Sequence, residues 1–276
     1  MTATAVPQSA PGAARSWRPP TIVDTLRAEW TKFRTVRSSF WSLLVATVLV
    51  VGLGALISLA ASHHYSQRSL SDQLGWDPTA VSLAGLTIGQ LALAVLGILF
   101  VTSEYSTGMI RISLAAVPHR SRLLGAKLAV FTLVALVAGE ILGFVSFLLG
   151  QAIIHGHAPS ASFHQPQILR AVIGSGLYVA LLAVIAVGIG TILRNAAAAI
   201  ATVVALLFVL PGVAQALPSS WRNPVTEYWP TQAGSQILQI HRDAHTLAPW
   251  AGFGVMAIFA AVVLAAAFAL INRRDA

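Results

Sequence analysis

Few residues of this chain could do chemistry, and the sets typical of enzymes are missing. The sequence has no cysteine and only nine acidic residues. It contains no G-x-x-x-x-G-K-[ST] phosphate-binding loop and no HExxH zinc motif, and no Ser/His/Asp set can be identified. A chain without a phosphate-binding loop cannot hydrolyse ATP alone. We therefore expect no catalytic residue and no enzyme activity in this chain.

Glu140 is the one acidic residue deep inside an apolar stretch. Placing a carboxylate at the centre of a bilayer costs ~2.5–3.5 kcal/mol on insertion scales. The side chain must therefore face protein or water, be paired, or be protonated. Two interpretations stay open: it lines a translocation path, or it makes a buried hydrogen bond to a neighbour such as Gln90 or Thr191.

Three of the eight histidines, His155, His157 and His164, lie in one loop and could bind a metal. No carboxylate lies near them in the sequence, so solvated loop histidines are the favoured interpretation. We expect no metal site.

The composition is that of an integral membrane protein. Hydrophobic residues make up 56% of the chain and charged residues 9%, whereas a soluble domain carries about a quarter charged residues. Each apolar stretch is long enough to cross a hydrocarbon core of about 30 Å as a helix. The sequence thus predicts an all-α membrane protein with six transmembrane helices, at about 41–61, 80–102, 123–154, 169–193, 196–217 and 249–271. The third is overlong, so its first turn should project from the membrane, and Arg194-Asn195 should form a tight turn.

The distribution of Lys and Arg predicts the orientation. Thirteen of the 17 Lys and Arg residues fall on one side of this topology and four on the other. The richer side should be cytoplasmic, which places both termini inside the plasma membrane. Because the basic residues lie at membrane edges, the net charge of +8 does not indicate nucleic acid as a partner. Residues 1–20, rich in Ala, Pro and Ser, predict a disordered cytoplasmic tail before a membrane domain at 21–276.

Small residues recur inside the apolar stretches. Gly85xxxGly89 and Gly139xxxGly143 are spaced so that each pair lies on one helix face. Such pairs let helix backbones approach closely, and we interpret them as packing positions.

Residues 21–39 predict a helix that lies in the membrane interface. Ile22, Leu26, Trp30 and Phe33 share one face, and Glu29 can pair with Lys32 at i,i+3. The alternative is a basic segment that only precedes the first span.

The loop between the second and third spans holds an extra helix. A short semi-apolar run from Met109 to Val117 lies between polar residues and a basic cluster. Thr107 could cap this helix and Pro118 could end it. Ile110, Leu114 and Val117 recur at helical spacing, so their face could press against a partner or the bilayer surface. The alternative is an ordinary basic cytoplasmic loop.

The fifth connection, 218–248, is rich in Pro and Trp. Its apolar residues Ile237, Leu238 and Ile240 are too few to cross a bilayer. It is typical of a short hairpin that dips partway into the outer leaflet, with tryptophans at headgroup depth. A plain external loop is the alternative.

Two of these segments carry a family resemblance. The stretch from Ser103-Glu104-Tyr105-Ser106-Thr107-Gly108 to Pro118-His119-Arg120 resembles the first cytoplasmic loop of ABC-2 type exporter permeases. The run from Glu29 to Arg37 looks like the elbow helix of many actinobacterial permeases of that family. Permeases of the family also have a partly inserted element between spans five and six.

The resemblance implies a function. It implies the transmembrane subunit of an ATP-driven ABC exporter that moves an amphipathic drug, lipid or peptide out of the cytoplasm, as in multidrug resistance. Such a subunit works as a homodimer or heterodimer with a second permease, in contact with membrane lipid. A separately encoded ATPase subunit binds the ATP and Mg²⁺, so this chain holds no cofactor.

The resemblance also implies a site that couples the ATPase to the permease. Its residues here would be Glu104, Tyr105, Gly108, Ile110, Arg111, Pro118 and Arg120, with Glu140 as a candidate for the translocation path. The alternative function is a secondary transporter without an ATPase partner. That class needs charged or broken helices at the midplane and commonly shows internal repeats, and this sequence offers only Glu140.

Overall fold

The computed structural model describes residues 20–117, 119–241 and 245–273, and the described part holds helices and no strand. The predicted tail at 1–20 lies outside the described residues except for Pro20. The α-helices are α1 (Ile22–Thr35), α2 (Arg37–Thr47), α3 (Leu53–His63), α4 (Leu70–Leu74), α5 (Pro78–Leu83), α6 (Leu86–Ser106), α7 (Met109–Ala116), α8 (Arg120–Ile154), α9 (Pro166–Leu193), α10 (Ala196–Val204), α11 (Leu210–Ala214), α12 (Ser219–Tyr228), α13 (Pro230–Ser235) and α14 (Pro249–Arg273). Two π-helical segments, η1 (Val48–Gly52) and η3 (Ala205–Val209), join α2 to α3 and α10 to α11, and short 3₁₀ turns occupy η2 (Tyr65–Gln67) and η4 (Gln236–Leu238).

Six helical segments of the described chain are long and apolar enough to cross a membrane, as the sequence predicts. They are Arg37–His63, Pro78–Ser106, Arg120–Ile154, Gln167–Leu193, Ala196–Ala214 and Pro249–Arg273. The third has 35 residues, about 52 Å at 1.5 Å per residue. It therefore exceeds a hydrocarbon core of about 30 Å and is long enough to project beyond it.

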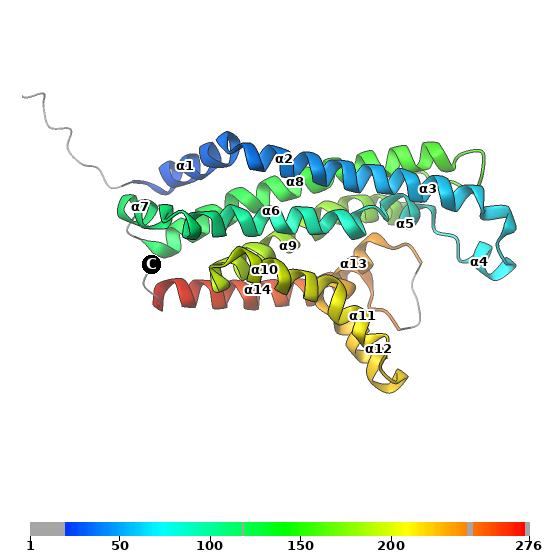
Figure 1. The fold of residues 1–276 in the computed structure, drawn as a ribbon. Coiled ribbons are helices and arrows are strands. Elements are labelled where there is room, and N and C mark those ends of the chain that lie inside the picture. The colour runs from blue at the N-terminus through cyan, green and yellow to red at the C-terminus, as the bar shows by residue number, and fades with distance from the viewer. Residues whose placement is uncertain (1–19, 118, 242–244, 274–276) are drawn as a thin grey trace, which may run out of the picture.

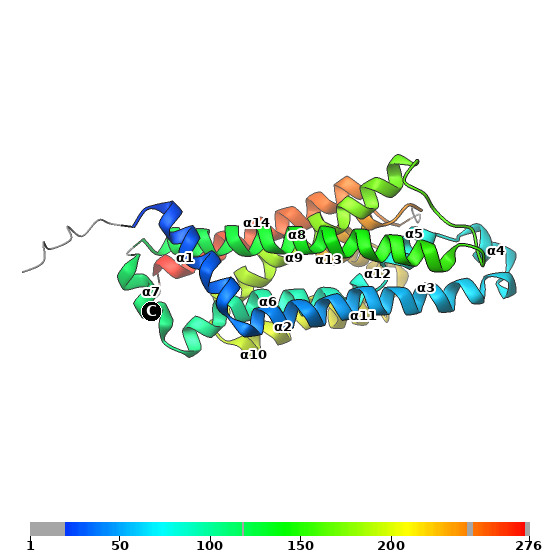
Figure 2. The ribbon, with the colours of Figure 1, turned by 90° about the horizontal axis from the view of Figure 1, so that it is seen from above.

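The helix α9 lies at the centre of the bundle (Figures 1 and 2). It packs against α6, α8 and α14 and is the most buried of the six long segments. Its side chains Leu182 and Ile185 meet Phe131 of α8 and Ile98 of α6 in the main core. The first, fifth and sixth segments are the least buried, so most of their apolar surface is free to face lipid or a second chain.

Glycines let the spans approach closely, as their spacing predicts. A Cβ atom at Gly85 would overlap the main-chain oxygen of Val50, and one at Gly89 would overlap the Val50 side chain. A Cβ atom at Gly139 would come within 3.0 Å of the Gly176 backbone. These contacts fix η1 against α6 and α8 against α9.

The turn between α9 and α10 is as short as predicted. Arg194 ends α9 in the left-handed conformation, with φ 54°. Asn195 caps α10, because its side-chain oxygen accepts a hydrogen bond from the Ala198 amide at 2.9 Å.

The basic residues gather at one end of the bundle. The helices α1 and α7, the first turns of α8, the α9–α10 turn and the last turn of α14 lie together there (Figure 1). We call this the basic end. Among the described residues it holds Arg27, Lys32, Arg34, Arg37, Arg111, Arg120, Arg122, Lys127, Arg194 and Arg273, whereas the opposite end holds only Arg68, Arg170 and Arg222.

The fifth connection holds two short helices, α12 and α13, in place of a plain loop. Pro230 begins α13, and the indole of Trp229 just before it donates a hydrogen bond to the Leu206 carbonyl at 2.8 Å. The helix α13 packs against α14, where a Cβ atom at Gly252 would overlap Ala233. The apolar residues Ile237 and Leu238 lie in the 3₁₀ turn that follows α13, which ends at Ser235.

We predict that Gly85→Ala destabilises the bundle by about 1–3 kcal/mol, because the added methyl group overlaps the backbone of the first span. Gly125→Ala is the matched control, since a Cβ atom there meets open space. The measurement is the temperature at which half of the solubilised protein stays monodisperse on size exclusion. Equal midpoints for the two variants would contradict the close approach.

Candidate functional site

The predicted apolar face of the helix α1 is divided between the bundle and the outside. A capping box starts it, in which Asp24 accepts from the Thr21 amide at 2.9 Å and Thr21 accepts from the Asp24 amide at 3.2 Å. Thr25, Glu29 and Phe33 face the bundle, while Ile22 and Trp30 are exposed. The predicted apolar face is thus divided. The physical reason is that Glu29 has charged partners inside the bundle, whereas Ile22 and Trp30 can face lipid.

Four charged side chains from three elements form a cluster at the basic end, and three of them are buried. Lys127 of α8 donates to Glu29 of α1 at 2.8 Å and to Glu104 of α6 at 2.6 Å. Lys32 of α1 bonds Glu29 at 3.0 Å and also contacts Glu104. Glu29, Glu104 and Lys127 are 2%, 4% and 2% exposed. Two carboxylates and two ammonium groups balance, so the cluster is neutral as a whole. We call it the charge cluster.

Aromatic rings seal the charge cluster from the core side. Phe33, Phe100 and Phe131 pack together with ring centroids 5.6–6.4 Å apart. The Lys127 ammonium lies 5.1 Å from the Phe100 ring centre, close enough for a cation–π interaction. Because little water reaches these charges, each depends on its partners for stabilisation.

The surroundings of Lys32 set its protonation state. Burial alone lowers the pKa of its ammonium group, but the hydrogen bond to Glu104 and the charge of Glu29 outweigh burial and raise the pKa above its usual value. A raised lysine pKa stabilises the fold at every pH below the usual value. That stabilisation is lost only as the pH rises through the raised pKa, well on the alkaline side. Lys32 therefore stays charged at physiological pH.

The sequence predicted the pair of Glu29 with Lys32 but not the complete charge cluster. Glu104 was expected only as a coupling residue that the family resemblance implies, and the structure buries Glu104 between two lysines. The sequence predicted no role for Lys127. The available signal was its position one turn inside an apolar helix, where a lone charge needs a partner of opposite sign.

The helix α7 begins differently from its prediction. Gly108 precedes it in the left-handed conformation, with φ 72°, which glycine adopts without strain. Thr107 does not cap α7, because its hydroxyl donates at 2.7 Å to the Ser103 carbonyl in the preceding helix. The helix ends at Ala116, with Val117 as its last flanking residue. Pro118 lies outside the described residues.

The face of α7 that was predicted to meet a partner is buried, and another face is exposed. Ile110 and Val117 are buried, and Ile110 lies beside Leu124 and Lys127 of α8. The predicted apolar face therefore holds α7 on its own bundle. The exposed face carries Ile112, which is 64% exposed, with Met109 and Arg111 beside it. The sequence missed Ile112, although an isoleucine outside the apolar stripe of a short helix was a usable signal.

Two more of the predicted coupling residues bind their own chain. The Arg194 guanidinium lies 5.3 Å from the Tyr105 ring centre, which ties the end of α6 to the α9–α10 turn. Arg120 donates to the Ile271 carbonyl at 3.2 Å, which ties the start of α8 to the end of α14. Among the described residues of the predicted site, Gly108 and Arg111 are the exposed ones.

Glu140 lies at the seam between α8 and α9, where its carboxyl group covers Gly176. Neither expected partner binds it. Gln90 accepts from the Tyr178 hydroxyl at 2.6 Å, and Thr191 donates to the Val187 carbonyl at 2.8 Å. The Oε2 atom of Glu140 is buried and has no hydrogen-bond partner among the described residues.

The histidines of the long loop do not gather. His157 lies beside His63, with ring centroids 4.6 Å apart and ring planes tilted by 52°, and His164 bonds Ser162. Within the described residues, no group of three or more His, Cys, Asp or Glu side chains could hold a metal ion.

We predict that Lys127→Met destabilises the protein by about 3–5 kcal/mol, because two buried carboxylates then share one lysine. Adding Glu104→Gln to Lys127→Met restores charge balance and should recover part of the loss. Arg34→Met, at an exposed position on α1, is the control. Thermal unfolding in mild detergent measures all three. A Lys127→Met variant as stable as the control would contradict the cluster.

The chain was compared with known proteins. The model of the family described as ABC-2 family transporter protein matches residues 25–212, a range from α1 through the first residues of α11. No curated protein matches the chain. The match covers more than half of the sequence, includes the charge cluster and α7, and agrees with six apolar helices in a multi-pass membrane protein. The chain therefore belongs to the ABC-2 family of membrane transport proteins.

Proposed function

We propose that this chain is the membrane subunit of an ATP-driven exporter and that the exposed face of α7 docks onto a separate ATPase subunit. The observation that carries the proposal is a short helix that is fixed to its own bundle by Ile110 and Val117 yet presents Ile112 and Arg111 outward. An exposed isoleucine beside a cation suits a shallow apolar pocket with an acidic rim on a partner. The partner would bind the ATP and Mg²⁺, since the chain has no phosphate-binding loop.

The charge cluster gives docking at α7 a mechanical consequence. Glu104 lies at the end of α6, a few residues before α7. Its bonds to Lys127 and Lys32 join α6 to α8 and α1. A push on α7 therefore acts on three elements together. Such rigid coupling lets closure of an ATPase tilt the spans of the permease.

The protein would lie in the plasma membrane, with its basic end facing the cytoplasm. The excess of Lys and Arg at that end, ten described residues against three, supports this orientation. The weakly buried first, fifth and sixth segments leave surface for a second permease chain and for lipid. The exported substrate would be amphipathic: a drug, a lipid or a peptide.

We predict that Ile112→Asp abolishes ATP-driven export, because a charge at the centre of the docking face is desolvated without a partner. Leu70→Asp is the matched control, since Leu70 of α4 is 73% exposed at the opposite end. Vesicles that contain the permease and its ATPase should retain export with the control variant. Both variants should insert normally, because neither side chain is buried. Full export by the Ile112→Asp variant would exclude this docking face.

Crosslinking tests the contact directly. A photoreactive residue at position 112 should crosslink to the ATPase, and one at position 70 should not. Export that continues without any ATPase would favour the secondary transporter, for which the unpartnered carboxyl group of Glu140 would be the first residue to test.

The orientation has its own test, because the chain has no cysteine. Cysteine introduced at Ser160, in the α8–α9 loop, should react in intact cells with an impermeant thiol reagent. Cysteine introduced at Ser121, near the start of α8, should react only after the membrane is opened. The reverse pattern would place the basic end outside.

A further inference from the structure

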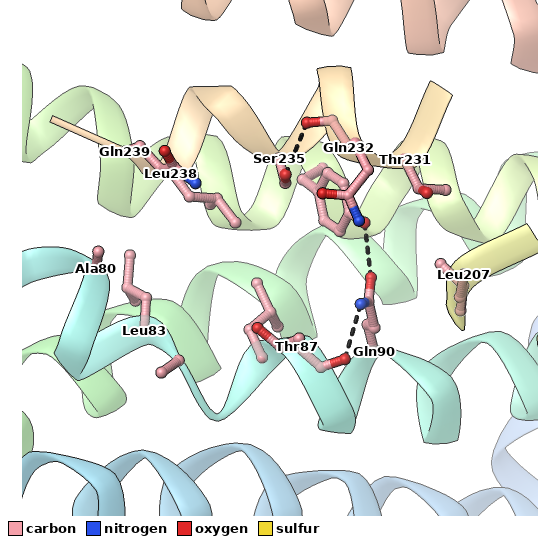
Figure 3. A pocket seen from close by; sticks show the side chains of 13 residues that line it. Ala80, Leu83, Thr87, Gln90, Leu207, Thr231, Gln232, Ser235, Leu238 and Gln239 are labelled. Atoms are coloured by element: carbon pink, nitrogen blue, oxygen red, sulfur yellow. Dashed lines mark hydrogen bonds between the residues drawn. The ribbon is translucent and has the colours of Figure 1, made fainter. Parts of the chain in front are cut away.

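A cavity of about 200 Å³ lies in the half of the bundle opposite the charge cluster. It is enclosed by α5 and the first turns of α6, by α9 and η3, and by α13 with its following 3₁₀ turn. Figure 3 shows Thr87 and Gln90 on one side of it, facing Thr231, Gln232 and Ser235 on the other. Neither the charge cluster nor α7 contributes a residue to its lining.

The lining has two kinds of surface. Hydroxyl and amide groups come from Thr87, Gln90, Tyr178, Thr231, Gln232, Ser235 and Gln239. Leucines form the apolar part, from Leu83, Leu86, Leu207 and Leu238. A lining that combines hydrogen-bonding groups with hydrocarbon surface matches a ligand with one hydrogen-bonding part and one hydrocarbon part.

Some polar groups of the lining already have partners and hold the cavity in shape. Tyr178 of α9 donates to the Gln90 side chain at 2.6 Å, and the Gln90 amide donates to the Thr87 carbonyl at 2.8 Å. Arg170 of α9 is not part of the lining, but it donates to the main-chain oxygen of Gln239 at 2.5 Å. These bonds fix Tyr178, Gln90 and the Gln239 backbone in place before any ligand binds.

Other polar groups of the lining are free to bind a ligand. The hydroxyl of Thr87 and the side-chain amides of Gln232 and Gln239 make no hydrogen bond to another described residue. An amide offers two donors and an acceptor, and a hydroxyl offers both. Together they suit a ligand that itself carries several hydroxyl groups.

The lining also excludes a class of ligands. None of the residues around the cavity is charged. An ion enclosed there would lose its hydration without gaining a counter-charge, which is strongly unfavourable. The cavity is also smaller than the roughly 300–1,000 Å³ of pockets that enclose whole drug-sized ligands. It fits a headgroup, with the remaining hydrocarbon outside.

We propose that this cavity binds the uncharged, hydroxyl-rich headgroup of the exported amphiphile, of the sugar or polyol class. The proposal rests on the exporter function, because it takes the occupant to be the transported substrate. The headgroup hydroxyls bond Thr87, Gln232 and Gln239, and the first carbons of the tail lie along the leucines.

Protection of an introduced cysteine tests the binding. Ser235→Cys places a thiol in the lining of the otherwise cysteine-free chain, and Ser160→Cys places one outside it. The purified protein in lipid vesicles is labelled with a maleimide in the presence of hexyl glucoside, hexyl phosphocholine or hexyl sulfate, each below its micellar concentration. Hexyl glucoside should slow labelling at position 235 and leave labelling at position 160 unchanged. The two charged amphiphiles should protect neither.

Two variants test whether the protection depends on hydrogen bonds to the headgroup. Thr87→Val and Gln232→Leu, each added to Ser235→Cys, should weaken protection by hexyl glucoside about two- to tenfold, the effect of losing one hydrogen bond. Gln236→Leu is the matched control, because Gln236 follows Ser235 directly but does not line the cavity. Thr87→Val keeps the shape of the side chain, so it remains informative if Gln232→Leu fails to fold.

The outcomes separate this proposal from the exporter function. Equal protection by all three amphiphiles, or by none, overturns headgroup recognition. A second outcome concerns the substrate. If hexyl glucoside protects position 235 but is not exported with ATP, in vesicles where position 112 crosslinks to the ATPase, then the bound headgroup is not that of the substrate. Failure of the crosslink at position 112 concerns only docking and leaves the protection result valid.

Discussion

The requirement that buried charges have partners determines the arrangement of the basic end. Glu29, Glu104 and Lys127 lie on three different helices, and each is almost fully buried. In surroundings with little water, a carboxylate without a cation nearby is several kcal/mol less stable. The helices α1, α6 and α8 can therefore satisfy their charges only by meeting at one place. The orientation of α1 follows from this requirement.

Away from this end, close packing replaces charge as the main constraint. Glycines at positions 85, 89, 139 and 143 remove side-chain atoms where the spans meet. Without a strong hydrophobic force between helices inside a membrane, such close contact is what holds the spans together. The permease is thus joined by ion pairs at one end and by backbone contact along its length.

The sequence predicted the parts of the fold that depend on local pattern. Six spans, the extra helices and the tight turn at Arg194 follow from length, polarity and turn chemistry. It failed where the outcome depends on which helices become neighbours. The face of α7 that carries Ile110 was expected to be free, because periodicity shows that a face is apolar but not what covers it. For the same reason the sequence predicted neither the place of Lys127 in the charge cluster nor the cavity around Gln90.

The helices α6 and α9 connect the charge cluster with the cavity around Gln90. Glu104 and Gln90 lie 14 positions apart on α6, about 21 Å along a helix. At the basic end α6 is held to the α9–α10 turn by Tyr105 and Arg194, and near the cavity it is held to α9 by Gln90 and Tyr178. Two helices held together at two separate places move as one body. A displacement imposed at α7 would therefore reach the α6 and α9 residues of the cavity together.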